Sequence, residues 1–283
     1  MLITLFGDGI APRGGAITLG SLFQLTAPFG LNERLVRTAI GRLANDAWLQ
    51  AERRGRISEY SLTASGRARF AAATERIYGV MPQGWDGRWT LIVPADTKAA
   101  AVQQFRDALR WEGFGEPARG VFIHPTRTAE SALALVAACT RETTPFVIRS
   151  EPQARAQDLR LARLGWNLPT IETSYHRFIR LFEPVARAVR KGSALSPATA
   201  FSIRTLLIHE FRKVHLRDPQ LPRELLPDGW SGMTAYELCR DIYAAVLNPS
   251  EQHLSEVAAC FAGHLPRADT QVLRRLGGIR ISV

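Results

Sequence analysis

The stretch 18–62 carries three hydrophobic patterns in succession, and their order restricts the fold more than any other feature of the chain. Apolar residues at helical spacing begin after Thr18 and stop at Pro28. A second helical pattern follows Asn32, a residue type that is favoured as an N-cap. Two strand-like runs then flank Gly55, which suits a tight turn. This order predicts helix, turn, helix and hairpin, as in a winged helix-turn-helix.

The second helix is expected to have an apolar seam and a polar outer face. At about 100° per residue, the seam consists of Val36, Ile40, Leu43 and Ala47. The opposite side and its shoulders carry Arg34, Arg37, Thr38, Arg42 and Asn45. A solvated helix face can explain these side chains, but the tip of the following hairpin is also basic, with Arg53, Arg54 and Arg56.

Two basic elements in succession favour binding to duplex DNA. Arginine can bridge O6 and N7 of guanine with two hydrogen bonds, so a helix in the major groove uses long donors on its outer face. Cations at a hairpin tip can meet phosphate oxygens or an adjacent minor groove. We therefore expect Arg34, Arg37 and Thr38 to contact bases, and the hairpin arginines to contact the backbone. Arg42 and Asn45 complete the expected DNA-binding set.

The charge distribution agrees with an anionic partner. The formal net charge is +10, and it divides into +4 for residues 1–80, +1 for 81–150 and +5 for 151–283. Such a balance favours nucleic acid, an anionic membrane surface or a phosphate-bearing ligand. Because only three lysines occur, the arginine excess can also reflect genome composition. The positions of the charges are therefore more informative than their total.

Several classes of protein are excluded by absent patterns. No apolar run approaches the roughly 18–20 residues of a membrane span. The N-terminus has neither the basic start nor the cleavage site of a signal peptide, so we expect a cytoplasmic protein. Cys139, Cys239 and Cys260 lie far apart and match no zinc spacing, which predicts buried free thiols in a reducing compartment.

The middle of the chain alternates strand and helix patterns, and the rest is mainly helical. Strands are expected at 87–96, 117–125 and 145–150, with helices at 98–114 and 129–140. This order predicts a small α+β domain of ferredoxin-like type. Further helices are expected at 171–190 and 197–216. Three prolines then fall within residues 219–227, which excludes a continuous helix and predicts an ordered loop.

No catalytic or metal site is expected. His209, Glu210 and His215 resemble part of a zinc-binding helix, but the metallopeptidase motif needs histidines four apart and these are six apart. No nucleophile elbow and no phosphate-binding loop occurs. The glycine-rich stretch 7–15 follows a helical pattern rather than a strand, which favours a turn over a dinucleotide site. We accordingly expect no cofactor.

Several segments resemble the PaaX family of bacterial transcriptional repressors, which control phenylacetate degradation operons. The N-terminal ones are LFGDGIAPRGGAITLGSL, NERLVRTAIGRL, RRGRISEYSLTASG and WDGRW. Farther along, LLIHEFRKVHLRDPQLPRELLPDGW resembles the proline-rich loop of the family, so the similarity covers almost the whole chain. One departure is Gly41, where the family commonly has an aromatic residue on the outer face of the reading helix. Glycine removes a side chain there that could touch DNA.

The resemblance implies a homodimeric repressor that binds an inverted-repeat operator and is released by an aryl-CoA thioester, with phenylacetyl-CoA as the leading effector. A CoA site needs cations and an apolar slot. The C-terminal region offers such groups in Trp166, His209, His215, Arg217 and Trp230. A packed loop explains Trp230 and Arg217 equally well.

The resemblance also relates the middle domain to the fold of a CRISPR spacer-acquisition nuclease. That relative uses an aspartate at the end of its first strand, and Asp96 occupies a comparable place. No second carboxylate accompanies it at metal-binding spacing, which favours a turn residue. Nuclease activity is therefore not inferred from the resemblance.

The sequence as a whole predicts an α+β protein with three parts. These are an N-terminal winged helix-turn-helix at 1–80, a central ferredoxin-like domain at 81–150 and a mainly α-helical dimerisation and effector domain at 151–283. Two other functions stay open. An acyl-CoA-responsive enzyme or scaffold would ignore promoter DNA and turn over a thioester. A metal-dependent nuclease acting through the central domain would cut DNA and lose that activity in Asp96→Ala.

Overall fold

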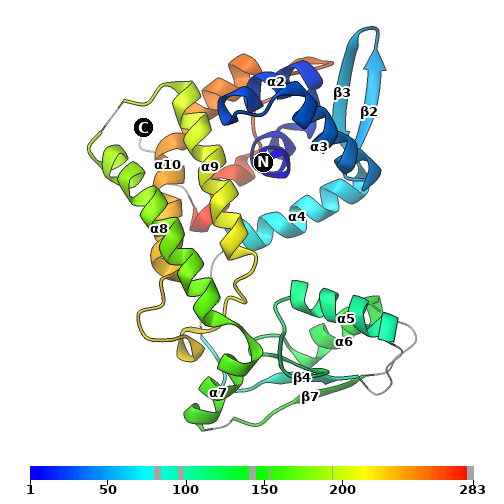
Figure 1. The fold of residues 1–283 in the computed structure, drawn as a ribbon, viewed down its shortest axis with the longest axis vertical. Coiled ribbons are helices and arrows are strands. Elements are labelled where there is room, and N and C mark those ends of the chain that lie inside the picture. The colour runs from blue at the N-terminus through cyan, green and yellow to red at the C-terminus, as the bar shows by residue number, and fades with distance from the viewer. Residues whose placement is uncertain (80–83, 95–98, 140–144, 153, 193, 279–283) are drawn as a thin grey trace. The chain divides into compact units, whose positions relative to one another are not determined.

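The computed structural model describes residues 1–79, 84–94, 99–139, 145–152, 154–192 and 194–278 (Figure 1). Contacts divide the chain into two compact units. The first unit comprises Met1–Val80, His176–His215 and Met233–Val283, and the second comprises Met81–Tyr175 and Leu216–Gly232. The two ends of the chain thus fold together in one unit. The three-part division expected from the sequence stays a prediction.

The first unit opens with a helical segment that is longer than the sequence predicts. Helix α1 (Leu2–Leu5) continues into the π-helical turn η1 (Phe6–Ile10) and the 3-10 turn η2 (Ala11–Arg13). Gly14 then ends the segment with a φ of 93°, a conformation that glycine adopts without steric cost. The expectation of a turn over 7–15 is therefore wrong as far as Arg13.

The helix, helix and hairpin expected next are confirmed as elements. They are β1 (Ala16–Thr18), α2 (Leu19–Thr26), η3 (Ala27–Phe29), α3 (Glu33–Asn45), β2 (Leu49–Arg54) and β3 (Ile57–Leu62). The Asn32 side chain caps α3 by accepting a hydrogen bond from the Leu35 backbone N–H at 2.9 Å. Gly55 begins the hairpin turn with a φ of 60°, and the antiparallel sheet has the order β1-β3-β2.

One residue of the predicted seam of α3 is misplaced. Val36, Ile40 and Leu43 are buried, as expected. Ala47 lies beyond the end of the helix with a φ of 56°, and it is exposed. Extending the helical period past Asn45 was wrong because α3 stops there.

Helices from later in the chain complete the first unit. They are α4 (Ala64–Tyr78), the part of α8 (Leu168–Arg190) from His176 onward, α9 (Pro197–His215) and α10 (Gly232–Val257). After α10 follow the two short strands β8 (Ala259–Cys260) and β9 (Gly263–His264) and the 3-10 segment η5 (Thr270–Gly277). Figure 1 shows α9 and α10 beside the N-terminal helices.

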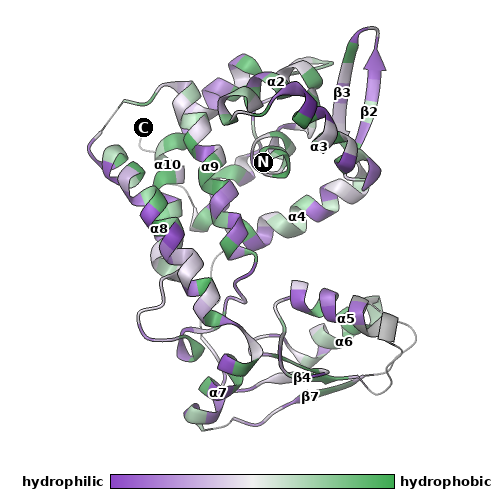
Figure 2. Cartoon of the chain, viewed as in Figure 1, coloured by the Kyte–Doolittle hydropathy of each residue, from purple (hydrophilic) through white to green (hydrophobic). Residues whose placement is uncertain are grey.

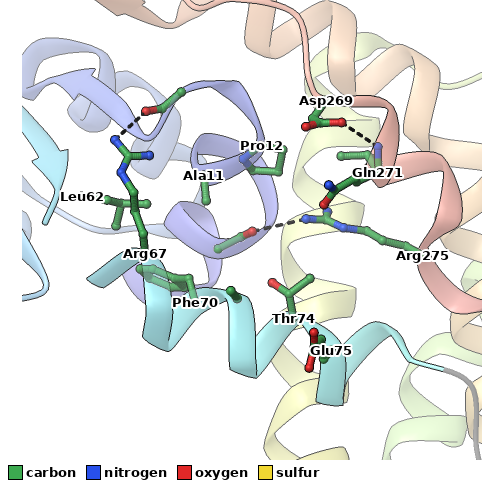
Figure 3. Close-up of a pocket in the computed structure, with 14 residues that line it drawn as sticks. Ala11, Pro12, Leu62, Arg67, Phe70, Thr74, Glu75, Asp269, Gln271 and Arg275 are labelled. Atoms are coloured by element: carbon green, nitrogen blue, oxygen red, sulfur yellow. Dashed lines mark hydrogen bonds between the residues drawn. The ribbon is translucent and has the colours of Figure 1, made fainter. Parts of the chain in front are cut away.

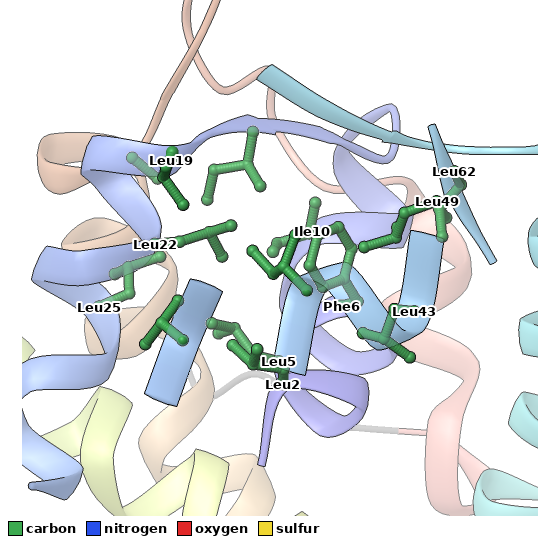
Figure 4. Packing of buried hydrophobic residues seen from close by; sticks show 14 of the residues in the cluster. Leu2, Leu5, Phe6, Ile10, Leu19, Leu22, Leu25, Leu43, Leu49 and Leu62 are labelled. Carbon is green, nitrogen blue, oxygen red and sulfur yellow. The ribbon is translucent and has the colours of Figure 1, made fainter. Parts of the chain in front are cut away.

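Both ends of the chain share one hydrophobic core. Figure 4 shows its N-terminal members. Leu22 and Ile40 belong to the same buried cluster as Phe201 of α9, Leu254 of α10 and Leu265. Burying an aliphatic or aromatic side chain contributes about 1.5–3 kcal/mol. The first 80 residues therefore depend on the C-terminal segment for part of their core.

The second unit is built on a four-stranded sheet. Its elements are β4 (Thr90–Val93), α5 (Ala99–Trp111), β5 (Gly115–Ala118), β6 (Val121–His124), α6 (Ala129–Cys139), β7 (Phe146–Arg149), α7 (Arg155–Gly165), the start of α8 and η4 (Arg223–Leu225). The strand order is β5-β6-β4-β7, and every neighbouring pair is antiparallel. The single strand expected at 117–125 is in fact the end of β5, a turn in which Gly120 has a φ of 79°, and β6.

Each face of this sheet has its own apolar layer. On one face Ile92 and Phe122 pack with Phe105 of α5 and with α6. On the other face Trp89 and Ile123 pack with α7 and with the proline-rich loop. That loop is ordered through buried Leu221 and Leu225, as the sequence predicts.

Two of the three cysteines can be compared with expectation. Cys239 is a buried free thiol, whereas Cys260 is free but only half-buried. The side chain of Cys139 lies outside the described part of the chain. Within the described ranges, none of the helices combines the length and the apolar character that crossing a membrane requires.

Candidate nucleic-acid interface

Helix α3 presents all of its predicted contact residues on its solvent side. Arg34, Arg37, Thr38, Arg42 and Asn45 are exposed, while the seam opposite them is buried. The helix begins at a capped N-terminus, with its one acidic residue in the first turn, Glu33, close to that end. Within α3 the outer face beyond the first turn therefore has no carboxylate, and the exposed Asp46 follows as the C-cap.

Arg37 is held in a defined position on this face. Its guanidinium lies over the ring of Phe23 on α2, 5.0 Å from the ring centroid. A Glu33 oxygen lies 3.4 Å away, but the Arg37 side chain remains 57% exposed. The hydroxyl of Thr38 donates to the Arg34 carbonyl at 2.9 Å, which leaves its oxygen able to accept one further hydrogen bond. Gly41 also faces outward, and nothing lies within 4 Å of where its Cβ would be.

The hairpin arginines do not form a single cluster. Successive side chains of a strand point to opposite faces, so Arg53 and Arg54 lie on different sides of the hairpin. Arg53 donates from Nε to the Gly55 carbonyl at 3.0 Å. Arg54 donates from Nε to a Glu52 carboxylate oxygen at 2.9 Å. Arg56 is an exposed residue of the turn itself.

The outer part of β2 is hydrophilic along its length (Figure 2). All residues from Gln50 to Arg54 are exposed, although they belong to a strand. From Gln50 onward neither face of β2 carries a row of apolar residues, so this part of the strand does not pack on a core. Its side chains are available to a partner.

Two aromatic residues of this surface were missed from the sequence. Phe23 supports Arg37, and Phe261, which follows β8, lies under Arg54 with 4.5 Å between the guanidinium carbon and the ring centroid. Helical spacing groups Phe23 with the apolar side of α2, where it is half-buried, and this spacing alone does not indicate its contact with Arg37. No local signal connects Phe261 with residue 54, because the contact is made only in the folded chain.

The predicted effector residues are distributed over both units. Trp166, Arg217 and Trp230 belong to the second unit. The indole N–H of Trp166 donates to the Gly113 carbonyl at 3.1 Å, and Trp230 packs edge-on against Tyr175 with 6.0 Å between ring centroids. Arg217 is exposed. The two tryptophans thus have structural roles in the packing of this unit.

The two predicted effector histidines belong to the first unit. His209 shares a hydrogen bond of 3.0 Å between Nδ1 and the Thr4 hydroxyl. His215 is buried and stacks on Phe211, with 4.6 Å between ring centroids. Burial is the main cause that lowers the pKa of each imidazole to about 4, with nearby cations adding to it. Both rings are neutral at pH 7, so neither supplies positive charge to a phosphate.

The catalytic alternatives gain no support from the described residues. Across those ranges, no group of three or more His, Cys, Asp or Glu side chains could hold a metal ion. Asp96 lies outside the described residues. His209 and His215 have different partners, as the preceding contacts show.

The first unit also contains a cavity of about 530 Å³ (Figure 3). Helix α4, the N-terminal helical segment and η5 line it. Its charged residues are Arg67, Glu75, Asp269 and Arg275, so positive and negative charges balance. The lining itself therefore gives no preference for an anionic ligand.

Comparisons with known proteins cover nearly the whole chain. Residues 1–66 match the family described as PaaX-like protein, residues 82–162 the PaaX protein central Cas2-like domain, and residues 166–256 the PaaX-like protein C-terminal domain. A curated protein of Escherichia coli strain K12, named transcriptional repressor PaaX, is 34% identical over 99% of this chain and 90% of its own length. A solved structure of an uncharacterized protein from Mycobacterium tuberculosis is 24% identical, with a TM-score of 0.50 over 81% of this chain and 88% of that one. The last comparison concerns the fold alone.

Proposed function

Because the chain belongs to the PaaX family, we propose that it is a transcriptional repressor that binds duplex DNA through its N-terminal segment. In this proposal α2 and α3 form a helix-turn-helix, α3 is the reading helix, and the β2–β3 hairpin is the wing. The protein is not an enzyme. It acts in the cytoplasm, where bacterial DNA is accessible.

One observation carries the proposal. Past its first turn, the solvent side of α3 has arginines and small polar residues, and it has no carboxylate. Solvation alone does not exclude acids from this face, whereas a carboxylate on a helix inside the major groove would be repelled by the phosphates of both strands. The position of Arg37 over Phe23 supports base contact, since a guanidinium that is already oriented loses less freedom on binding.

The proposed DNA-binding residues fall into two roles. Arg34, Arg37 and Thr38 lie nearest the start of α3 and are proposed to contact base edges. The remaining proposed contacts are to the DNA backbone or the minor groove, by Arg42, Asn45, Arg53, Arg54 and Arg56. Gly41 leaves an open place on the same face, so contacts around it are made by its neighbours.

The remaining parts of the chain are proposed to dimerise and to sense an effector. The strand order β5-β6-β4-β7 with all pairs antiparallel supports a ferredoxin-like layout for the central domain. A homodimer suits an inverted-repeat operator, since two half-sites about one helical turn apart match a two-fold axis. The effector is proposed to be phenylacetyl-CoA or a related aryl-CoA thioester, and the regulated operon one for aromatic-acid degradation. Of the five predicted effector residues, Arg217 is the exposed one. The other four have partners within the fold: Trp166, His209, His215 and Trp230.

A gel-shift titration with the promoter region upstream of the gene tests the proposal. The protein should bind this duplex at least tenfold more tightly than an unrelated duplex of equal length at the same salt concentration. Phenylacetyl-CoA should release it, while free CoA serves as the control ligand. Equal affinity for both duplexes would refute a sequence-specific repressor. Specific binding without release would refute only the effector.

A further inference from the structure

A short hairpin near the C-terminus, formed by β8 and β9, packs against α2 and the β2–β3 hairpin. Strands β8 and β9 pair antiparallel directly after α10. The backbone N–H of Leu265 donates to the carbonyl of Ala258 at 3.1 Å, and both side chains are buried in the shared core. The hairpin is therefore fixed to the end of α10.

This hairpin makes three specific contacts with the proposed helix-turn-helix and wing. The backbone N–H of Ala259 donates to the hydroxyl of Ser21 on α2 at 2.9 Å. The backbone N–H of Phe261 donates to the carboxylate of Glu59 on β3. The ring of Phe261 lies under the guanidinium of Arg54 on β2, 4.5 Å from the centroid. The C-terminal hairpin thus contacts both α2 of the proposed helix-turn-helix and the two strands of the proposed wing.

The face of the wing that carries Arg54 also carries two carboxylates. Glu52 and Glu59 are direct partners across the β2–β3 ladder, so their side chains share a face, and Arg54 is two residues from Glu52 on the same face. Like charges opposite each other are unfavourable. The N–H of Phe261 binds the Glu59 carboxylate, which leaves Glu52 as the carboxylate that pairs with Arg54.

Arg54 is otherwise a flexible side chain, since it is 64% exposed and its pairing with Glu52 is at the surface. An exposed arginine loses much rotamer freedom when a partner immobilises it. The aromatic ring restricts that freedom before the partner arrives, because a guanidinium stacks on an aromatic face. Phe261 therefore orients a cation of the wing from a position more than 200 residues away in the sequence.

We propose that Phe261 is a positioning residue for DNA binding, which holds Arg54 on the wing in the orientation that meets a phosphate. This inference rests on the proposed function. It implies that the end of α10, the C-terminal hairpin and the wing move as one body. A displacement of α10 would then reach the DNA-binding surface through Phe261 and Ser21.

A double-mutant cycle tests the inference. Phe261→Ala should weaken operator binding by about two- to fivefold, because an unsupported Arg54 would lose side-chain freedom on binding that the ring now removes beforehand. In an Arg54→Ala background the same change should have no effect, because the group it acts through is absent. Arg53 lies on the other face of the hairpin, so Phe261→Ala should weaken binding equally with and without Arg53→Ala. That second cycle is the matched control.

Conservative variants separate orientation from packing. Phe261→Tyr keeps the ring and should bind the operator like the original protein, whereas Phe261→Leu keeps apolar bulk and should bind like Phe261→Ala. If Phe261→Ala proves unfolded by circular dichroism, the Leu and Tyr variants provide the cycle instead. Full binding by Phe261→Leu, or independent effects of Phe261 and Arg54, would overturn the inference.

A DNA-free measurement distinguishes failure of the inference from failure of the proposed function. In an NMR spectrum with labelled arginine, the Nε–H signal of Arg54 should carry a ring-current shift that Phe261→Leu removes. If that shift is present but no duplex binds specifically, the proposed function falls and the positioning role falls with it. If operator binding is specific and no such shift exists, only the positioning role is overturned.

Discussion

Replacing Asp8 by asparagine should destabilise the first unit by about 3–5 kcal/mol, the cost expected when one partner is removed from a buried ion pair. Asp8 is buried in η1, and four donors converge on its carboxylate. They are Arg204 Nε at 2.7 Å, Arg275 Nη1 at 2.8 Å, the Tyr78 hydroxyl at 2.6 Å and the Tyr243 hydroxyl at 2.9 Å. These donors come from α9, η5, α4 and α10.

The charge balance around Asp8 explains the size of the effect. Arg13, Arg204 and Arg275 are almost fully buried and face two carboxylates, those of Asp8 and Glu251. Burial by itself would raise the pKa of Asp8, but the two guanidiniums and the hydrogen bonds outweigh it and lower the pKa. The group is therefore charged at pH 7, and asparagine would leave three buried cations facing one carboxylate. An amide nitrogen would also point a donor at other donors.

Urea unfolding followed by far-UV circular dichroism measures this loss, provided that the two units are distinguished. Five of the six tryptophans belong to the second unit and only Trp48 belongs to the first, so tryptophan fluorescence reports mainly the second unit. Hydrogen exchange by mass spectrometry on peptides from α1, α9 and α10 localises the change. With a denaturant slope of about 2 kcal/mol per M, the midpoint of the first unit should fall by roughly 2 M.

A surface aspartate provides the matched control. Asp86 is 56% exposed and pairs with Arg149 at 2.7 Å, so Asp86→Asn should cost less than about 1 kcal/mol. An Asp8→Asn loss as small as that of the control would refute the account of a buried ion-pair network. Faster exchange confined to the second unit would refute it as well.

Other substitutions test separate parts of the structure. Arg37→Ala should weaken operator binding by about 1–3 kcal/mol and relax specificity at one base pair, and gel shifts showing equal losses on unrelated DNA would reassign Arg37 to a phosphate contact. Arg53→Ala should reduce the salt slope of binding by about 1, and an unchanged slope would count against a wing contact. Thr63→Ala should cost about 1–2 kcal/mol in urea unfolding, because Thr63 Oγ1 accepts the Gly66 N–H at 2.9 Å as the N-cap of α4; Thr63→Ser should retain most of that stability. The lowered pKa of His215, about 4 against 6.5, means that only the unfolded chain binds this proton between those values, so its contribution is present above pH 6.5 and is lost as the pH falls toward 4. Between pH 7 and pH 5 the contribution of His215 should fall by about 2 kcal/mol, so urea unfolding at both pH values should show a pH-dependent loss smaller by that amount in His215→Phe. A remaining loss is expected from His209, whose pKa is also lowered to about 4.

The elements that the sequence predicted well depend on signals close together in the chain. Asn32 marks the start of α3, and the spacing of Val36, Ile40 and Leu43 gives its buried side. Gly55 similarly gives the turn of the hairpin. Each of these signals acts over a few residues, so a single sequence is enough to detect it.

The two elements that were missed differ in the range of their contacts. The glycine-rich stretch 7–15 is predicted to be a turn because it follows a helical pattern rather than a strand, yet η1 is helical around Asp8, whose partners come from four later elements. The hairpin of β5 and β6 was interpreted as one strand because its turn at Gly120 is short and lies between apolar residues. At residues 7–15 tertiary contacts overrode the local preference, whereas the turn at Gly120 carried a local glycine signal like that of Gly55.

The shared core and the Asp8 network limit how this protein can transmit a signal. Leu254 and Leu265 pack on the same cluster as the seam of α3, and Arg204 and Arg275 bind the helical segment that precedes it. A ligand that displaced α9 or α10 would also displace the N-terminal elements that share their core, because packed cores transmit displacement. An effector of the proposed kind would therefore not need to approach the proposed DNA-binding face to alter it. It need only bind one arrangement of these helices more tightly than another, and the difference in affinity sets how far DNA binding shifts.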